Sequence, residues 1–195
     1  MKNFKVTYLF ILSLSFLAIS CSDDDSAPVV PVVNNVMEIG GQQFDIDSAL
    51  LESWGENGDG SYDWDVSFYT EGFSFNSETE EYVGTGAVLL LDLNTDSAGG
   101  LVPGNYVYST ERAAFKWVFA LSGTNVDTAD DSAGDFLTYN QGTVTITGTG
   151  EDQIITVDIL SESGETNTTA TYKGSFNFVD YSTTKKNKSK PYYKL

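Results

Sequence analysis

The sequence predicts an all-β fold, either an antiparallel β-sandwich or a calycin-like β-barrel of about nine or ten strands. Apolar and polar residues alternate along most of residues 36–181, which is the period of a strand. Gly, Asn, Asp and Ser interrupt this alternation at short intervals, as turn residues do. Thr, Val and Tyr, which favour strands, are frequent, and no segment has a convincing amphipathic helical period. Counting strands does not separate the sandwich from the barrel.

The first strands are bounded by glycine. Residues 36–39 and 42–46 flank Gly40 and Gly41, a pair that tolerates the positive φ of a tight hairpin turn. Residues 49–54 are expected to form the next strand.

Two strands near the centre of the domain carry the clearest patterns. Between residues 62 and 68, aromatic and aliphatic residues alternate with Asp63, Asp65 and Ser67. We therefore expect the aromatic face in the core and the acidic face toward water. Residues 86–93 (GAVLLLDL) are almost entirely apolar, which is typical of a central strand.

The second half of the domain repeats this alternation. Pro103 and Gly104 predict a turn, and the acidic residues 123–135 predict a long loop. The remaining strands are expected at residues 105–110, 113–121, 142–147, 153–160 and 170–178.

The charge of the chain excludes one class of partner. The formal net charge is −18, and all 28 acidic residues lie after Cys21. Between Cys21 and Asp180 the basic residues are Arg112, Lys116 and Lys173. Such a surface repels phosphate backbones, so a nucleic-acid partner is not expected. The apolar fraction of 41% is sufficient for one folded domain with tails.

The N-terminus has the pattern of an export signal. Lys2 and Lys5 precede an apolar run of 14 residues at positions 6–19. This run is shorter than the roughly 20 residues that cross a bilayer, but it fits a signal peptide. We expect the signal peptide to cover residues 1–20.

The residues that end this signal resemble the lipobox of bacterial lipoproteins. They read LAISC at positions 17–21, although the family prefers Leu three residues before the cysteine, where this chain has Ala18. The resemblance implies cleavage before Cys21, acylation of its thiol and amine, and anchoring in the outer membrane. Several acyl chains exceed what stable anchoring requires. Ordinary cleavage after Ser20 is the alternative, and it would give a secreted protein.

The residues after the cysteine indicate the side of the membrane. Ser22 to Asp25 (SDDD) resembles the surface-export signal of lipoproteins from the Bacteroidota, which implies a protein facing the cell exterior. The alternative is an ordinary solvated tether. Pro28 and Pro31 favour an extended segment, so residues 21–35 are expected to be a flexible tether before the β domain at residues 36–181.

The C-terminal residues 182–195 invert the charge. We expect a disordered basic tail. The alternatives are that it folds against its own acidic domain or that it contacts phosphate groups of the outer leaflet. Its basic residues are Lys185, Lys186, Lys188, Lys190 and Lys194.

The residue types exclude several kinds of catalysis. The chain has no histidine and one cysteine, so Ser/His/Asp and Cys/His mechanisms and the usual zinc sites are not available. Asp63 and Asp65 would lie about 6.6–6.8 Å apart on one strand face. That spacing matches the roughly 6.5–9.5 Å of inverting glycosidases. An alternating strand needs a polar face in any case, so we expect no catalytic residue and keep a carboxylate-dependent glycoside hydrolase as the least favoured function.

No cofactor is expected, although two loops have side chains that suit structural calcium. Calcium takes six to eight oxygen ligands, which clustered Asp and Asn can supply, but Asp, Asn and Gly are also ordinary turn residues. Neither loop has the spacing of a known calcium-binding loop. The candidates are Asn57, Asp59 and Asp63 in the first loop, and Asp127, Asp130, Asp131 and Asp135 in the second.

Sugar binding would require exposed aromatic faces. Trp64 and Trp117 are in phase with core residues, so we expect them to be buried. Trp54, beside a glycine at a strand end, is the better candidate, with Tyr62 or Tyr82. The alternative is that these rings close the end of the β core.

A recurring Asp-Ser/Thr-Ala triplet resembles the O-glycosylation acceptor of exported Bacteroidota proteins. The acceptor hydroxyls in expected loops would be those of Ser26, Ser97, Thr128 and Ser132.

Taken together, these features favour a surface-anchored lipoprotein with a non-enzymatic β domain that binds a glycan, a small ligand or an outer-membrane protein. The second hypothesis is a structural or adhesive acidic coat protein. A cavity lined by aromatic residues would favour binding, and a filled core would favour the coat.

Overall fold

The computed structural model describes residues 32–130, 132–183 and 190, and nearly all of their regular structure is β. One short 3₁₀ helix, Gly150–Asp152, interrupts the strands. Among the described residues, no helix has the length and apolar character needed to cross a membrane. The strands are β1 (Val36–Ile39), β2 (Gln42–Asp45), β3 (Ser48–Glu56), β4 (Tyr62–Tyr69), β5 (Phe73–Asn76), β6 (Glu81–Thr95), β7 (Gly104–Tyr108), β8 (Lys116–Asp127), β9 (Asp135–Thr147), β10 (Ile154–Ser161), β11 (Asn167–Tyr172) and β12 (Asn177–Asp180).

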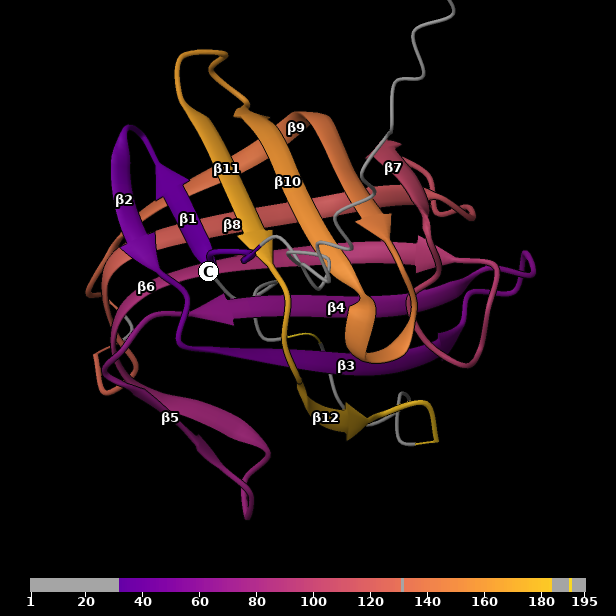
Figure 1. Cartoon of the computed structure of the whole chain (residues 1–195), viewed down its shortest axis with the longest axis horizontal. Helices are drawn as coiled ribbons and strands as arrows, with labels where there is room; N and C mark the ends of the chain where they lie inside the picture. The colour runs from indigo at the N-terminus through magenta and orange to yellow at the C-terminus, as the bar shows by residue number, and fades with distance from the viewer. Residues whose placement is uncertain (1–31, 131, 184–189, 191–195) are drawn as a thin grey trace, which may run out of the picture. The chain divides into compact units, whose positions relative to one another are not determined.

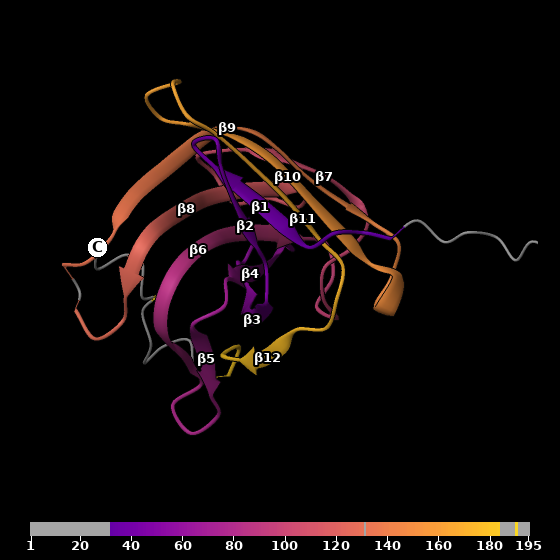
Figure 2. The same cartoon turned by 60° about the vertical axis from the view of Figure 1, so that its left-hand side comes forward.

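The strands form one curled sheet in the order β12-β3-β4-β6-β8-β7-β9-β10-β11-β1-β2, with β5 paired to β6 (Figure 1). The pairings β12–β3 and β7–β8 are parallel, and the other pairings are antiparallel. Figure 2 shows β6 and β8 bending strongly, so that β9, β10 and β11 lie over β3, β4 and β6. The sheet is therefore a half-barrel, and β12 and β2 are its two edges.

Side chains fill the inside of this half-barrel. Phe68 on β4 contacts Tyr172 on β11, with ring centroids 5.2 Å apart, so the two sides of the curl meet. Leu91 on β6 and Ile159 on β10 are among the fully buried residues. Trp64 and Trp117 belong to the same core, which confirms the prediction that both are buried.

A second apolar cluster lies on the opposite, outer face of β3 and β4. It contains Leu50 and Trp54 of β3, and β5, the start of β6 and β12 contribute to it. The ring of Trp54 packs against that of Tyr181 at 4.7 Å, and Tyr69 stacks on Tyr82 at 3.9 Å. Because both faces of β3 and β4 are covered, polar side chains on the outer face of these strands are removed from water.

The structure confirms the all-β class and corrects several boundaries. The described residues form twelve strands where nine or ten were predicted, because β5 was missed and residues 170–178 are divided between β11 and β12. The expected loop at 123–135 is much shorter, since β8 continues to Asp127 and β9 starts at Asp135. The predicted signal peptide, the predicted lipidation residue Cys21 and most of the predicted tether lie in residues 1–31, outside the described residues.

Candidate functional site

Acidic side chains form a row across the outer face of three neighbouring strands. Glu52 on β3 is the cross-strand partner of Asp65 on β4, and Asp65 is the partner of Asp92 on β6. Asp63 lies two residues before Asp65 and opposite Asn94. Like charges placed directly opposite each other destabilise a sheet, so this row requires compensating cations.

All of these carboxyl groups are buried, which corrects the prediction that Asp63 and Asp65 face water. Asp63 and Asp65 are each 2% exposed and Asp92 is fully buried. Alternation along β4 identified the face correctly, but that face is covered by other parts of the chain. The sheet therefore carries a buried acidic cluster, which we define as Asp63, Asp65 and Asp92.

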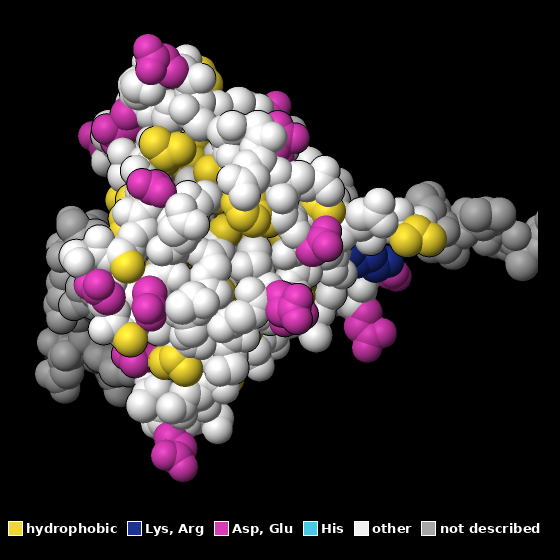
Figure 3. Space-filling model, turned by 90° about the vertical axis from the view of Figure 1, so that its left-hand side faces the viewer, with side chains coloured by type: hydrophobic (Ala, Val, Ile, Leu, Met, Phe, Trp, Pro, Cys, Tyr) yellow, Lys and Arg dark blue, Asp and Glu magenta, His cyan; other side chains and the backbone are white. Residues whose placement is uncertain are grey.

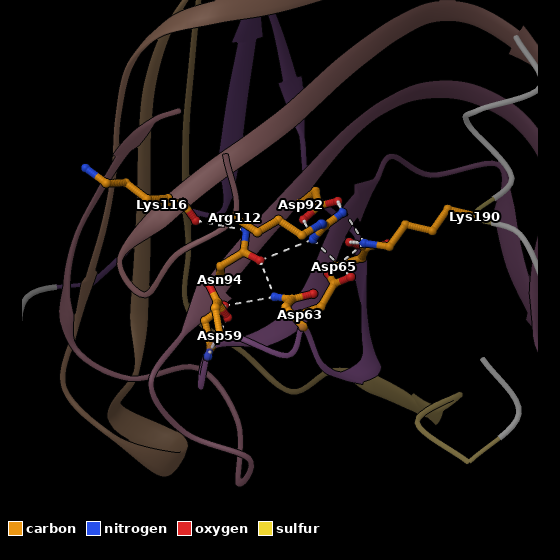
Figure 4. Close-up of polar contacts among 10 residues, drawn as sticks. Asp59, Asp63, Asp65, Asp92, Asn94, Arg112, Lys116 and Lys190 are labelled. Atoms are coloured by element: carbon orange, nitrogen blue, oxygen red, sulfur yellow. Dashed lines mark hydrogen bonds and ion pairs between the residues drawn. The ribbon is translucent and has the colours of Figure 1, made fainter. Parts of the chain in front are cut away.

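Lys190 provides the first cation of the acidic cluster (Figure 4). Its Nζ donates to Oδ1 of Asp63 at 2.7 Å, to Oδ1 of Asp65 at 2.6 Å and to Oδ2 of Asp92 at 2.8 Å. The ammonium group also lies 5.4 Å from the ring centre of Trp54, which adds a cation–π contact. Lys190 is itself 6% exposed, so these bonds form away from water, where each is strong. At this residue the basic tail does contact its own acidic domain; residues 184–189 and 191–195 lie outside the described residues.

Arg112 provides the second cation, from the connection between β7 and β8. Its two terminal nitrogens bind both oxygens of Asp92 at 2.9 and 2.7 Å in a bidentate arrangement, which is among the stronger kinds of hydrogen bonding in proteins. Nη1 also lies 3.0 Å from Oδ2 of Asp63 and 3.2 Å from Oδ1 of Asn94. The backbone N–H of Phe115 donates to the carbonyl of Asn94 at 2.7 Å, which ties this connection to β6 and holds Arg112 over the cluster.

Burial favours the uncharged forms of Asp63 and Asp65, whereas the neighbouring cations favour their charged forms. Desolvation raises the pKa of Asp65 well above its ordinary value, and Lys190 only partly opposes this. Desolvation also raises the pKa of Asp63, with Asp92 adding to it and the two cations opposing it. Burial by itself would lower the pKa of Lys190, but the three carboxylates outweigh it and raise that pKa. Burial therefore favours the uncharged form of Asp65 more strongly than that of Asp63.

The acidic cluster also has the spacing of a cation site. One carboxylate oxygen from each of Asp63, Asp65 and Asp92 can lie within 4.8 Å of the other two. In this structure the ammonium group of Lys190 occupies the position among them, at hydrogen-bonding distance from all three. The geometry therefore describes a receptor for a primary ammonium group.

The first predicted calcium loop is organised by turn hydrogen bonds. Oδ1 of Asp59 accepts from both the backbone N–H and the hydroxyl of Ser61, and these bonds lower the pKa of Asp59. The side-chain amide of Asn57 donates to Ser61 and to Oδ1 of Asn94. Asp63 is held in the acidic cluster. Of this predicted set, the structure thus brings only Asp63 into a group of converging carboxylates among the described residues.

The second predicted calcium loop uses its acids in the same way. Asp127 accepts from the backbone N–H of Ala129, and Asp130 accepts from the N–H and hydroxyl of Ser132. Asp135 accepts from the side chain of Asn125. Asp131 lies outside the described residues. Calcium binding at either loop stays a prediction.

The three candidate sugar-binding aromatics are not exposed platforms. Trp54 and Tyr82 are buried in the outer cluster, and Tyr62 is half-buried against the inner core. Trp54 and Tyr82 therefore do not present the free face that stacking on a sugar requires, because they pack in the apolar cluster on the outer face of β3 and β4.

The candidate glycosylation residues lie in loops, as expected. Ser97 is half-buried, whereas Thr128 and Ser132 are exposed. The hydroxyl of Thr128 is bonded to the backbone of Gly84, and that of Ser132 to Asp130. Ser26 and the lipidation residue Cys21 lie outside the described residues.

Sequence reasoning missed the three residues that complete the cluster. A signal for Asp92 was present, because it is the one charged residue in the apolar segment GAVLLLDL, and a charge inside a central strand needs a partner. Arg112 could have been suspected, since it is one of only three basic residues between Cys21 and Asp180. Nothing in the local pattern distinguishes Lys190 from the other lysines of the tail.

Comparison with known proteins adds no family to this description. No family model matches the sequence, and no curated protein or solved structure matches it.

Proposed function

We propose that this chain is a lipid-anchored, non-enzymatic protein of the bacterial cell surface, and that its β domain binds an extracellular partner through its outer surface. The signal region supports the location, with Cys21 as the acylated residue and the acidic run after it as the export signal. The ion pairs of the acidic cluster support a non-enzymatic role, because each of its three carboxyl groups is bound to Lys190.

The filled interior of the half-barrel is the observation that carries this proposal. Barrels that hold a small apolar ligand enclose it in an internal cavity. Here Phe68 and Tyr172 meet across the inside of the curl, and large side chains on both sides are fully buried. We therefore place recognition on the outside of the domain.

An open depression beside the inner core is the best candidate for the contact. It has a volume of about 530 Å³, and it is lined by Phe44 of β2, Thr70 just after β4, residues 85–87 of β6, residues 125–127 of β8 and Ala133. Phe44 supplies an aromatic side chain, and Asn125 and Asp127 supply polar groups. An aromatic ring beside amide and carboxylate groups suits a sugar, whose faces are apolar and whose hydroxyls form hydrogen bonds.

Replacing Phe44 by alanine tests this depression. On an array of bacterial and host polysaccharide fragments, the unmodified protein is expected to bind a defined subset, and Phe44→Ala is expected to lose at least tenfold in affinity for it. Val107→Ala removes an exposed apolar side chain from β7 and serves as the matched control, with unchanged binding expected. Equal binding by both variants, or no binding by the unmodified protein, would reject the glycan.

The acidic coat is the second candidate function, and the distribution of charge favours it. Figure 3 shows acidic side chains scattered over the visible face, with a single basic patch. The exposed loop hydroxyls of Thr128 and Ser132 would extend such a surface if they carry glycans. An intact mass equal to that of the bare lipidated polypeptide would remove the glycan from this hypothesis.

The cellular location has its own test. Proteinase K added to intact cells is expected to digest the protein, because the β domain would face the medium. Cys21→Ser, which cannot be acylated by the lipoprotein pathway, is expected to disappear from the membrane fraction. Complete protection of the unmodified protein in intact cells, with digestion after lysis, would contradict the outward orientation.

A further inference from the structure

The C-terminal region of the chain meets the acidic cluster at Lys190. The single cysteine of the chain, Cys21, excludes an intramolecular disulfide, so the β domain has no such staple. Lys190 nevertheless lies 98 residues beyond Asp92 and 125 beyond Asp65 in sequence, with its Nζ in contact with both. A nucleophile and several electrophilic carbon atoms are thus held together in a buried place.

We propose that Lys190 and Asp65 form an intramolecular isopeptide bond, which joins the C-terminal region of the chain covalently to β4. The bond would link Nζ of Lys190 to Cγ of Asp65. It is a modification of the folded domain, and it does not depend on what the domain binds.

Asp65 is the best electrophile of the three because an uncharged carboxylic acid accepts a nucleophile, whereas a carboxylate does not. Arg112 binds Asp92 through both oxygens and Asp63 through one, so these two carboxyl groups are engaged by a second cation as well as by Lys190. Asp65 also has the shortest contact with Lys190, at 2.6 Å. Its burial also raises its pKa, which favours the uncharged acid.

The atoms of the reaction balance without any further reactant. The ammonium group of Lys190 first gives one proton to the carboxylate of Asp92, which lies 2.8 Å away. The nitrogen lone pair then attacks Cγ of Asp65 and forms the C–N bond. The nitrogen loses a second proton to the departing hydroxyl group, which leaves as water. The products are a neutral amide, one water and a protonated Asp92, with no change in total charge or oxidation state.

Burial stabilises the amide product, and the fixed contact between the reacting groups increases the rate at which it forms. The reaction removes the charges of Lys190 and Asp92, so the cost of keeping this ion pair away from water disappears. Groups held in a reactive arrangement behave as though present at effective concentrations of about 10⁵–10⁸ M. The same carboxylates raise the pKa of Lys190, which leaves little neutral amine, so the bond is expected to form slowly after folding.

Mass spectrometry of the purified full-length chain tests the proposal. Proteolysis is expected to release a branched peptide in which residue 190 is joined to residue 65, lighter by one water than its two parts. In the Cys21→Ser form, which lacks lipid, the intact mass is expected to be lower than the sequence mass by one water.

Two variants make the result specific. Lys190→Arg keeps a cation in the cluster but lacks the amine, so it is expected to retain the full mass. Asp59-Gly60 can also lose water by local cyclisation, and loss that persists in Lys190→Arg would assign the change to such a reaction and overturn the proposal. Asp65→Asn is expected to form the same bond with release of ammonia in place of water.

Other outcomes are equally decisive. An unmodified mass in the folded protein after prolonged incubation would overturn the proposal. A branch that maps to Asp63 or Asp92 would overturn the choice of electrophile. A lysine held only by ion pairs loses its stabilisation as the pH rises above its ordinary pKa of 10.5, because the folded pKa is raised. An amide has no such proton, so the wild type and Lys190→Arg are expected to show the same alkaline stability profile.

Discussion

Lys190→Ala is expected to destabilise the β domain by about 3–5 kcal/mol, because it leaves the buried acids of β4 and β6 without one of their two cations. The acids would have to take up protons or admit water, and both cost free energy. Urea unfolding followed by tryptophan fluorescence measures the change. If the isopeptide bond forms, its loss adds to this effect, and Lys190→Arg separates the charge from the covalent bond.

A lysine at the surface provides the matched control. Lys173 pairs with Asp152 at 3.0 Å, but the side chain of Asp152 is 86% exposed. Exposed ion pairs are worth about 0–1 kcal/mol, so Lys173→Ala is expected to have a small effect. Similar losses in Lys173→Ala and Lys190→Ala would mean that the buried cluster has no special role in stability.

Phe68→Ala is expected to cost about 3–5 kcal/mol, because it opens a cavity at the point where the two sides of the half-barrel meet. Phe68 is fully buried and contacts Tyr172, so its removal takes packing from β4 and β11 together. Thermal and urea unfolding should both report the loss.

Phe178→Ala is the corresponding control, since this phenylalanine is 57% exposed on β12. Substitutions of exposed residues change stability by about 0.5 kcal/mol or less in most cases. If Phe68→Ala unfolds with the same midpoint as the wild type, the interior is not packed as described and could admit a ligand.

Much of the fold could be predicted because strand periodicity is a local property. The Gly40-Gly41 hairpin, the alternation on β4 and the apolar centre of β6 all follow from neighbouring residues, and all three elements occur. The parallel pairings of β12 and β7 could not be predicted, since they depend on how distant segments approach. For the same reason the sequence does not distinguish a sandwich from a barrel. The structure is a half-barrel.

The acidic cluster shows the limit of the same reasoning. Alternation placed Asp63 and Asp65 on one face, and that is correct. Whether the face meets water depends on Arg112, on Lys190 and on the outer apolar cluster, which come from other parts of the chain. Burial is a property of tertiary structure, so periodicity alone identified a polar face but missed a buried ion-pair network.

The distance in sequence between the acids and Lys190 has a consequence for the order of assembly. Synthesis from the N-terminus produces β3, β4 and β6 before residue 190, which follows Asp92 by 98 positions. Until then the three strands can pair only with their acids protonated or hydrated. The acidic cluster is therefore completed only after residue 190 has been made, and a polypeptide interrupted before that point would keep these buried acids without the Lys190 cation.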